Sequence, residues 1–349
     1  MWRIFCTSQG MRTLQFVILA ALMSACARVE ATTPSVQVHM SNVDLHVTAD
    51  ITLHIRQLRG AFVPVARRTP YLDDKQSYEV MVDSGEVAVD IASLNALMTH
   101  ALAGDHSNVD KLRLMIAEDG TLQQKGVIDK AINIPFNMKS VVSVTTDGRI
   151  RVTAKSVKGF GIPMKPVMSL FRIGMDDLVK VKPGRGVVVA GNDLILDPSE
   201  LLPAPAFKGR LTAVRVEGSS LVQVFGNTPR PASASGSRTL AKNHLYWRGG
   251  QLAFGKLTMT DADLEIVDLD PGDPLDFSVD HWTEQLVAGY SKTLSNRGLR
   301  AFVPDYSDLR QTREPSKVSS GESPPPGRLV PHGGQESTRT SSRRPGTTR

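Results

Sequence analysis

Cysteine and aromatic residues are scarce in this chain of 349 residues, which has two cysteines and 5% aromatic residues. Both cysteines, Cys6 and Cys26, lie near the start, so the rest of the chain has no disulfide and no thiol chemistry. The low aromatic content argues against a surface that stacks nucleic-acid bases. The net charge of +6 does not change this, because residues 1–30 carry +2, residues 307–349 carry +4 and residues 31–306 are neutral. We therefore expect no nucleic-acid partner.

Catalytic motifs are also missing, because the chain has no G-x-S-x-G, H-E-x-x-H or C-x-x-C sequence. The segment from Gly250 to Lys256, GQLAFGK, has the spacing of a phosphate-binding loop, but Leu257 replaces the Ser or Thr that binds magnesium. The residues that follow alternate like a strand, whereas a phosphate-binding loop opens a helix. We therefore predict a protein without enzymatic activity and without a cofactor.

Two groups of polar residues carry side chains of the kind that bind metal ions, but neither has a metal-site spacing. Asp44, His46, Asp50 and His54 share one face of a predicted strand and have no further nitrogen or sulfur ligand nearby in sequence. The four aspartates in DLDPGDPLD, residues 268–276, depart from the D-x-D-x-D-G spacing of a calcium loop. We expect both groups to be solvated, and we predict no metal site.

The chain has no apolar run of the roughly 20 residues that a membrane-spanning helix needs. A shorter run, Leu14 to Met23, follows Arg12 and precedes Ala25-Cys26-Ala27, which predicts an export signal over residues 1–27 and a tether over residues 28–42. Three interpretations stay open: ordinary cleavage, lipidation at Cys26, or an uncleaved anchor. The sequence LMSAC resembles a lipoprotein signal, although Met23 stands where that signal prefers Leu, Val or Ile. Each places the protein in the periplasm or cell envelope, with the membrane surface as a partner if Cys26 is lipidated.

Alternating apolar residues dominate the stretch from Ile128 to Ile162, which predicts two long strands with one apolar face. Asp147-Gly148 joins the two strands, and the same dipeptide at 119–120 precedes them, so three consecutive strands should form an antiparallel meander. The first arm would have about 19 residues, whereas most strands have about 3 to 10. We therefore expect it to bend near Pro135, which cannot donate a ladder hydrogen bond.

The remaining elements follow from hydrophobic periodicity and from helix start and stop signals. We expect one strand over 43–55, a hairpin over 78–91 with its turn at 83–86, and helices over 94–103, 165–180 and 281–296. Ser93 is the expected N-cap of the first helix.

These elements predict an α+β, β-rich fold, in which a long curved antiparallel meander sheet wraps around or packs on two or three helices. We assign the main domain to residues 43–226, a Gly/Pro/Ser-rich linker to 227–242, and a small β-hairpin plus helix unit to 243–306. Residues 307–349 contain few apolar residues, so we expect this tail to be disordered.

Leucine, methionine and phenylalanine line one side of the first two predicted helices and the apolar face of the first long strand. These residues are candidates for lining a ligand groove: Leu94, Leu97, Met98, Leu102, Phe136, Met138, Met164, Met168 and Phe171. Methionine suits such a groove because it is flexible and polarisable. The alternative is that the same side chains fill a solid core, as stripes of this kind usually do.

Four segments together resemble bacterial envelope lipid-binding proteins of the AsmA-like and tubular lipid-binding (TULIP-like) groups: VDLHVTADI at 43–51, IASLNALM at 91–98, GFGIPM at 159–164 and DPSELLP at 197–203. The resemblance covers about residues 43–225 and implies a curved sheet that holds lipid tails without catalytic residues. We therefore expect an exported protein that binds or shuttles lipid or another apolar ligand. The alternative is an envelope scaffold that binds a protein partner and holds no ligand.

Overall fold

The computed structural model describes residues 35–102, 109–129, 133–159, 162–163, 186–191, 193–226 and 239–313. It has 58% strand and 13% helix, which confirms a β-rich fold with large antiparallel sheets. The chain divides into one unit from Met1 to Gln311 and a second from Thr312 to Arg349. All sheets and cavities described below lie in the first unit. The expected helix over 165–180 lies outside the described residues, as do the export signal, most of the linker and nearly all of the C-terminal tail.

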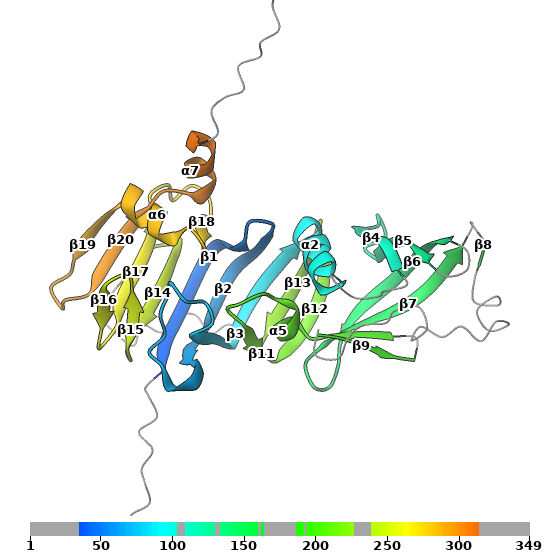
Figure 1. The fold of residues 1–349 in the computed structure, drawn as a ribbon, viewed down its shortest axis with the longest axis horizontal. Helices are drawn as coiled ribbons and strands as arrows, with labels where there is room; N and C mark the ends of the chain where they lie inside the picture. The colour runs from blue at the N-terminus through cyan, green and yellow to red at the C-terminus, as the bar shows by residue number, and fades with distance from the viewer. Residues whose placement is uncertain are drawn as a thin grey trace, which may run out of the picture. The chain divides into compact units, whose positions relative to one another are not determined.

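Eleven strands form the larger sheet, whose main path runs β12-β13-β3-β2-β1-β14-β17-β20-β19 (Figure 1). Most neighbours are antiparallel, and β17 pairs with β20 in parallel. The strands are β1 (Val36–Thr48), β2 (Ile51–Pro64), β3 (Tyr78–Asp90), β11 (Phe207–Gly209), β12 (Leu211–Glu217), β13 (Ser220–Phe225), β14 (His244–Arg248), β17 (Asp263–Asp268), β18 (Leu275–Ser278), β19 (Tyr290–Thr293) and β20 (Leu299–Val303). Strands from the start and the end of the described chain therefore share one sheet.

The long strand β1 has two neighbours along the edge that faces away from β2. β14 pairs with residues 37–41, and β18 pairs in parallel with residues 43–46. Asn42 lies between these two segments with a φ of 53°, which asparagine adopts more readily than most residues. Its side-chain amide donates to Asn243 Oδ1 at 2.8 Å. This bond lies where β1 changes partners, so two short strands can cover one long edge.

Two strand predictions and one tether prediction on this sheet are wrong. The expected single strand over 43–55 is a hairpin of β1 and β2, and part of the expected tether over 28–42 belongs to β1. The turn takes two residues, so Val47 and Ile51 keep an even spacing and both point into the core. The expected hairpin over 78–91 is the single strand β3. A Cβ at Gly85 would lie 2.9 Å from the Gln57 carbonyl oxygen, so this glycine allows close approach to β2 instead of forming a turn.

The second sheet has the order β4-β5-β6-β7-β10-β9, with β8 paired to β7. Its strands are β4 (Val109–Ile116), β5 (Leu122–Asp129), β6 (Asn133–Val144), β7 (Ile150–Gly159), β8 (Ile162–Pro163), β9 (Val187–Ala190) and β10 (Asp193–Leu196). An antiparallel meander is confirmed, but it has four strands, β4 to β7, where we predicted three; Gly120 and Gly148 have the positive φ values that two of its turns require. The predicted long arm through Pro135 is wrong, because Asp129 pairs with Asn133 and the arm is divided between β5 and β6.

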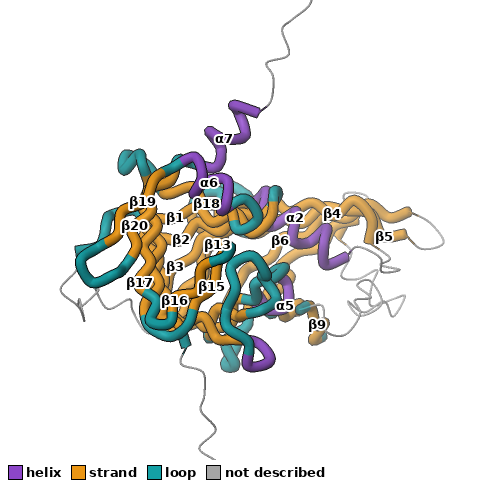
Figure 2. Tube along the Cα trace, turned by 60° about the vertical axis from the view of Figure 1, so that its left-hand side comes forward, coloured by secondary structure: helices purple, strands orange, loops and turns teal. Residues whose placement is uncertain are grey.

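Four α-helices occur in the described residues: α2 (Ile91–Leu102), α5 (Pro198–Leu201), α6 (Trp282–Ala288) and α7 (Tyr306–Arg313). α2 begins earlier than predicted, because Asp90 Oδ1 accepts from the Ser93 backbone N–H at 2.7 Å and so caps the helix. Ser93 has another role, since its hydroxyl oxygen accepts from the Thr52 N–H at 2.9 Å. α2 packs against β2, β3 and β4, and Figure 2 shows it beside β4.

The predicted helix over 281–296 is wrong beyond α6. Residues 290–293 form β19, and Tyr290 stacks on Phe302 of β20 with ring centroids 4.7 Å apart. Gly289 ends the helix at a close crossing, where a Cβ would lie 1.9 Å from the Phe302 carbonyl oxygen. The apolar residues spaced four apart, which predicted one helix, therefore belong first to a helix and then to a strand. Residues 243–306, which we expected as a separate unit, extend the larger sheet, and only β15 (Leu252–Phe254) and β16 (Leu257–Met259) form a small sheet of their own.

Candidate functional site

An apolar cavity of about 60 Å³ lies where α2, the second sheet and α5 meet. Fourteen of its lining residues are apolar, and Gln223 is the only polar one. They are Val89, Leu94, Leu97, Met98, Leu114, Leu122, Val142, Ile150, Val152, Leu196, Pro198, Leu201, Leu202, Leu221 and Gln223. We call this space the α2 cavity. It suits a hydrocarbon group, because it has no charged side chain that would orient an ionic ligand.

The structure brings three of the predicted groove residues together in the α2 cavity: Leu94, Leu97 and Met98. Phe136 and Met138 lie on β6 but do not line the cavity, and Met138 is buried with 7% exposure. The Leu102 side chain lies outside the described part of the structure, as do Met164, Met168, Phe171 and the lipidation candidate Cys26. The helix stripe thus identified one wall of this cavity.

Sequence reasoning missed the opposite walls, which come from β10, α5 and β13. The sequence does contain local signals for the helix α5. Asp197 caps it by accepting from the Ser199 N–H at 3.0 Å, and Pro198 occupies its first turn. Glu200 Oε2 accepts from the Gly186 N–H at 3.0 Å, which ties α5 to the residue preceding β9. The DPSEL sequence therefore indicates a short helix, but no local pattern shows that it faces α2.

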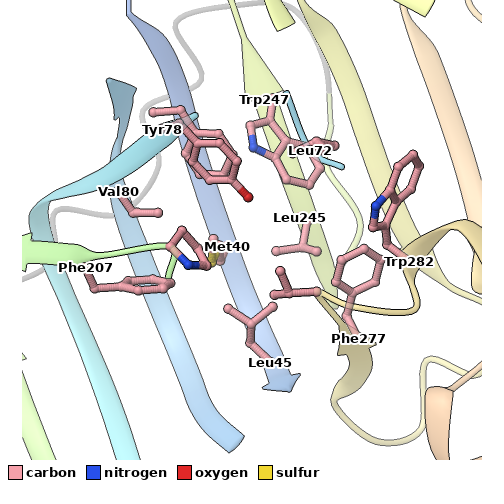
Figure 3. Close-up of a pocket in the computed structure, with 13 residues that line it drawn as sticks. Met40, Leu45, Leu72, Tyr78, Val80, Phe207, Leu245, Trp247, Phe277 and Trp282 are labelled. Carbon is pink, nitrogen blue, oxygen red and sulfur yellow. The ribbon is translucent and has the colours of Figure 1, made fainter. Parts of the chain in front are cut away.

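A second cavity, of about 40 Å³, lies over β1, β2, β3 and β14 of the larger sheet. Aromatic rings form much of its wall, and Figure 3 shows Tyr78 and Trp247 on one side and Phe277 and Trp282 on another. Phe62 also lines it, stacking on Tyr78 with centroids 4.4 Å apart and meeting Trp247 edge-on at 5.8 Å. We call this space the aromatic cavity.

The polar residues considered as metal ligands are divided into separate pairs. His54 Nδ1 lies 2.8 Å from Asp44 Oδ1, and this hydrogen bond raises the pKa of His54. His46 Nε2 lies 2.6 Å from Asp276 Oδ1, an aspartate of the 268–276 loop. Within the described residues, no group of three or more His, Cys, Asp or Glu side chains is arranged to hold a metal ion.

Comparisons with known proteins add no relative: no family model matches the chain, and no curated protein or solved structure is significantly similar to it. Among the described residues, no helix combines the length and apolar character needed to cross a membrane.

Proposed function

We propose that this protein binds a lipid or another ligand with an apolar chain, without catalysing a reaction, and that the end of the chain occupies the α2 cavity. The observation that carries the proposal is the composition of this cavity, with fourteen apolar lining residues and one amide. Burial of each methylene group in such a place is worth about 0.8 kcal/mol. A chain that enters the cavity therefore gains affinity without any charged or catalytic group.

The size of the α2 cavity limits what enters it. Its volume of about 60 Å³ is smaller than the ~150 Å³ of an engineered apolar cavity that binds benzene. The proposed occupant is therefore the terminal part of an acyl chain. Met98 and Leu94 on α2 are only partly buried, so these two side chains have room to change rotamer around a chain of variable length.

The resemblance to AsmA-like and tubular lipid-binding proteins supports the same class of ligand and a location in the cell envelope. We include export through residues 1–27, with or without lipidation at Cys26, in the proposal. Replacing Cys26 with Ser should move a lipidated protein out of the membrane fraction. An unchanged distribution would contradict lipidation.

A second candidate is an envelope scaffold that binds a protein partner and has a solid core. The small volume of the α2 cavity favours this candidate, because a protein that carries whole lipids usually encloses several hundred Å³. The two candidates differ in whether lipid accompanies the purified protein.

Organic extraction of the purified protein, followed by mass spectrometry, separates the two candidates. Lipid binding predicts a stoichiometric acyl lipid in the extract and displacement of a fluorescent fatty acid by that lipid. Absence of lipid from the extract together with failure to bind the fluorescent fatty acid would exclude the first candidate.

A pair of matched variants locates the ligand. Val142 lines the α2 cavity, whereas Val144, two residues along the same strand β6, packs on the core without lining it. Val142→Phe should fill the cavity and reduce fatty-acid binding at least tenfold, whereas Val144→Phe should leave binding near that of the unchanged protein. Equal effects of the two substitutions would place the ligand elsewhere.

A further inference from the structure

The aromatic cavity contains one polar group that lacks a partner. Trp247 is buried with 3% exposure, and its indole N–H has no hydrogen-bond acceptor. Buried indole N–H groups in proteins usually have a hydrogen-bond acceptor. Burial removes their hydrogen bonds to water, and leaving those bonds unreplaced costs free energy. Figure 3 shows the indole nitrogen beside the space between Tyr78 and Leu245. An acceptor supplied from outside the chain would satisfy this donor.

The rest of the wall restricts the chemistry of that acceptor. Met40, Leu45 and Phe207 line the cavity together with its other aromatic rings, and no Lys, Arg, Asp or Glu side chain lines it. Burial raises the pKa of the Tyr78 hydroxyl, so this group stays neutral and supplies no counter-charge. An anion would enter without a counter-charge, and a cation would leave the Trp247 N–H without an acceptor, so an uncharged ligand fits this cavity best.

We propose that the aromatic cavity is a binding site for a small uncharged group that carries one hydrogen-bond acceptor, such as a carbonyl or ether oxygen on a short apolar body, with Trp247 Nε1 as the donor. The volume of about 40 Å³ exceeds the 10 to 15 Å³ that one water molecule needs. It is well below the ~150 Å³ of a cavity that holds benzene, so only a few non-hydrogen atoms fit.

This site is distinct from the α2 cavity. The two cavities share no lining residue, and only the aromatic cavity has a buried donor without an acceptor in the described structure. The α2 cavity suits a hydrocarbon end, whereas the aromatic cavity suits a group with a polar atom at one point. The proposal for Trp247 therefore stands whether or not acyl chains bind beneath α2.

Nuclear magnetic resonance of the ¹⁵N-labelled full chain tests the proposal directly, because the sequence has three tryptophans and two of them, Trp247 and Trp282, line this cavity. The probes are acetone and 2-methylpropene, which have nearly the same shape but differ in the acceptor oxygen. Acetone should shift the Trp247 indole proton downfield in a saturable manner, and 2-methylpropene should cause no downfield shift. A linear, unsaturable response to acetone, or no response, would overturn the proposal.

Two variants complete the experiment. Trp247→Phe keeps an aromatic ring and removes the donor, so the affinity for acetone relative to that for 2-methylpropene, both read from the Trp282 indole resonance, should fall about tenfold. If that variant does not fold, Val279→Leu reduces the cavity and leaves Trp247 in place; the acetone response should then disappear. An exchange signal between the Trp247 indole proton and a long-lived water molecule in the free protein would also refute the assignment, because water would then satisfy the donor.

Discussion

The two sheets differ in how completely their apolar faces are buried. On β2 of the larger sheet, Ile51, Leu53 and Ile55 expose at most 2% of their surface. On β6 of the second sheet, Met138 exposes 7%, and Val142 is only partly buried. The apolar side chains of β2 are therefore more completely buried than those of β6, and the larger of the two cavities lies between the second sheet and α2. The comparison predicts that a buried side chain contributes more to stability in the larger sheet than beside the α2 cavity.

Truncation of one buried leucine in each sheet should show this difference most strongly. Leu53→Ala should lower the free energy of unfolding by about 4 kcal/mol, and Leu114→Ala by about 2 kcal/mol. The reason is that Leu53 is packed against neighbours on its core face, whereas Leu114 lines the α2 cavity and already lacks some contacts. Urea unfolding of the purified variants measures both values.

An exposed leucine supplies the control for that experiment. Leu257 on β16 is 48% exposed, so Leu257→Ala should change the free energy of unfolding by less than about 0.5 kcal/mol. If Leu53→Ala and Leu114→Ala cost the same, the second sheet is packed as tightly as the first and the comparison fails.

Buried amide side chains provide a smaller contrast between the same two regions. Gln285, fully buried beside the larger sheet, donates to the carbonyl oxygens of Asp276 and Pro304 at 2.8 and 2.9 Å and accepts from the Ser278 N–H. Gln285→Met leaves all three backbone groups without this partner and should cost about 3 kcal/mol.

The buried polar pair of the second sheet is simpler. The Ser140 hydroxyl donates to Gln124 Oε1 at 2.9 Å, and both residues are buried. Ser140→Ala should therefore cost about 1 kcal/mol, measured by the same urea titration. A loss from Ser140→Ala as large as that from Gln285→Met would show that the second sheet depends on its polar pair as strongly as the larger sheet depends on Gln285.

Local sequence signals predicted the second sheet better than the larger one, because its strands pair with their sequence neighbours. The Asp-Gly turns at 119–120 and 147–148 set that meander, and both occur in the structure. In the larger sheet, Val38 pairs with Trp247, more than 200 residues away, and such a pairing leaves no local pattern. The alternation of apolar residues also predicted one strand over 43–55 where the structure has two. The turn after Thr48 has two residues, so the alternation continues unchanged from β1 into β2.

The candidate site divides in the same way. The stripe of Leu94, Leu97 and Met98 follows from helical periodicity, and these three residues do line a cavity together. Their partner Leu221 lies on β13, and its position depends on pairing between β13 and β3. The unpaired donor of Trp247 has no sequence signal either, because it depends on the absence of an acceptor in the folded chain. Periodicity thus predicts faces of single elements, and tertiary pairing decides which faces meet.

Acid pH should also distinguish the two sheets. Burial lowers the pKa of His39 on β1 to about 4, with His244 and Arg59 adding to the decrease, and His39 Nδ1 lies 2.8 Å from His244 Nε2. Between pH 6.5 and 4 the unfolded chain therefore binds a proton at this position that the folded chain does not, so stability falls as the pH falls. In the second sheet, the Lys139 ammonium holds the pKa of Asp119 below its ordinary value, and that group titrates below this window.

The matched variants are His39→Gln and Asp119→Asn, compared with the unchanged protein by urea unfolding at pH 7 and pH 5. His39→Gln removes the proton uptake of the unfolded chain, so this variant should lose less stability on acidification than the unchanged protein loses. Asp119→Asn should shift stability by the same amount at both pH values. Burial raises the pKa of Asp305 to about 7, which gives an opposite slope that is common to all three proteins and cancels in the differences. If His39→Gln and the unchanged protein lose the same stability on acidification, the pKa of His39 is not lowered in the folded chain. The two sheets would then not differ in their response to acid.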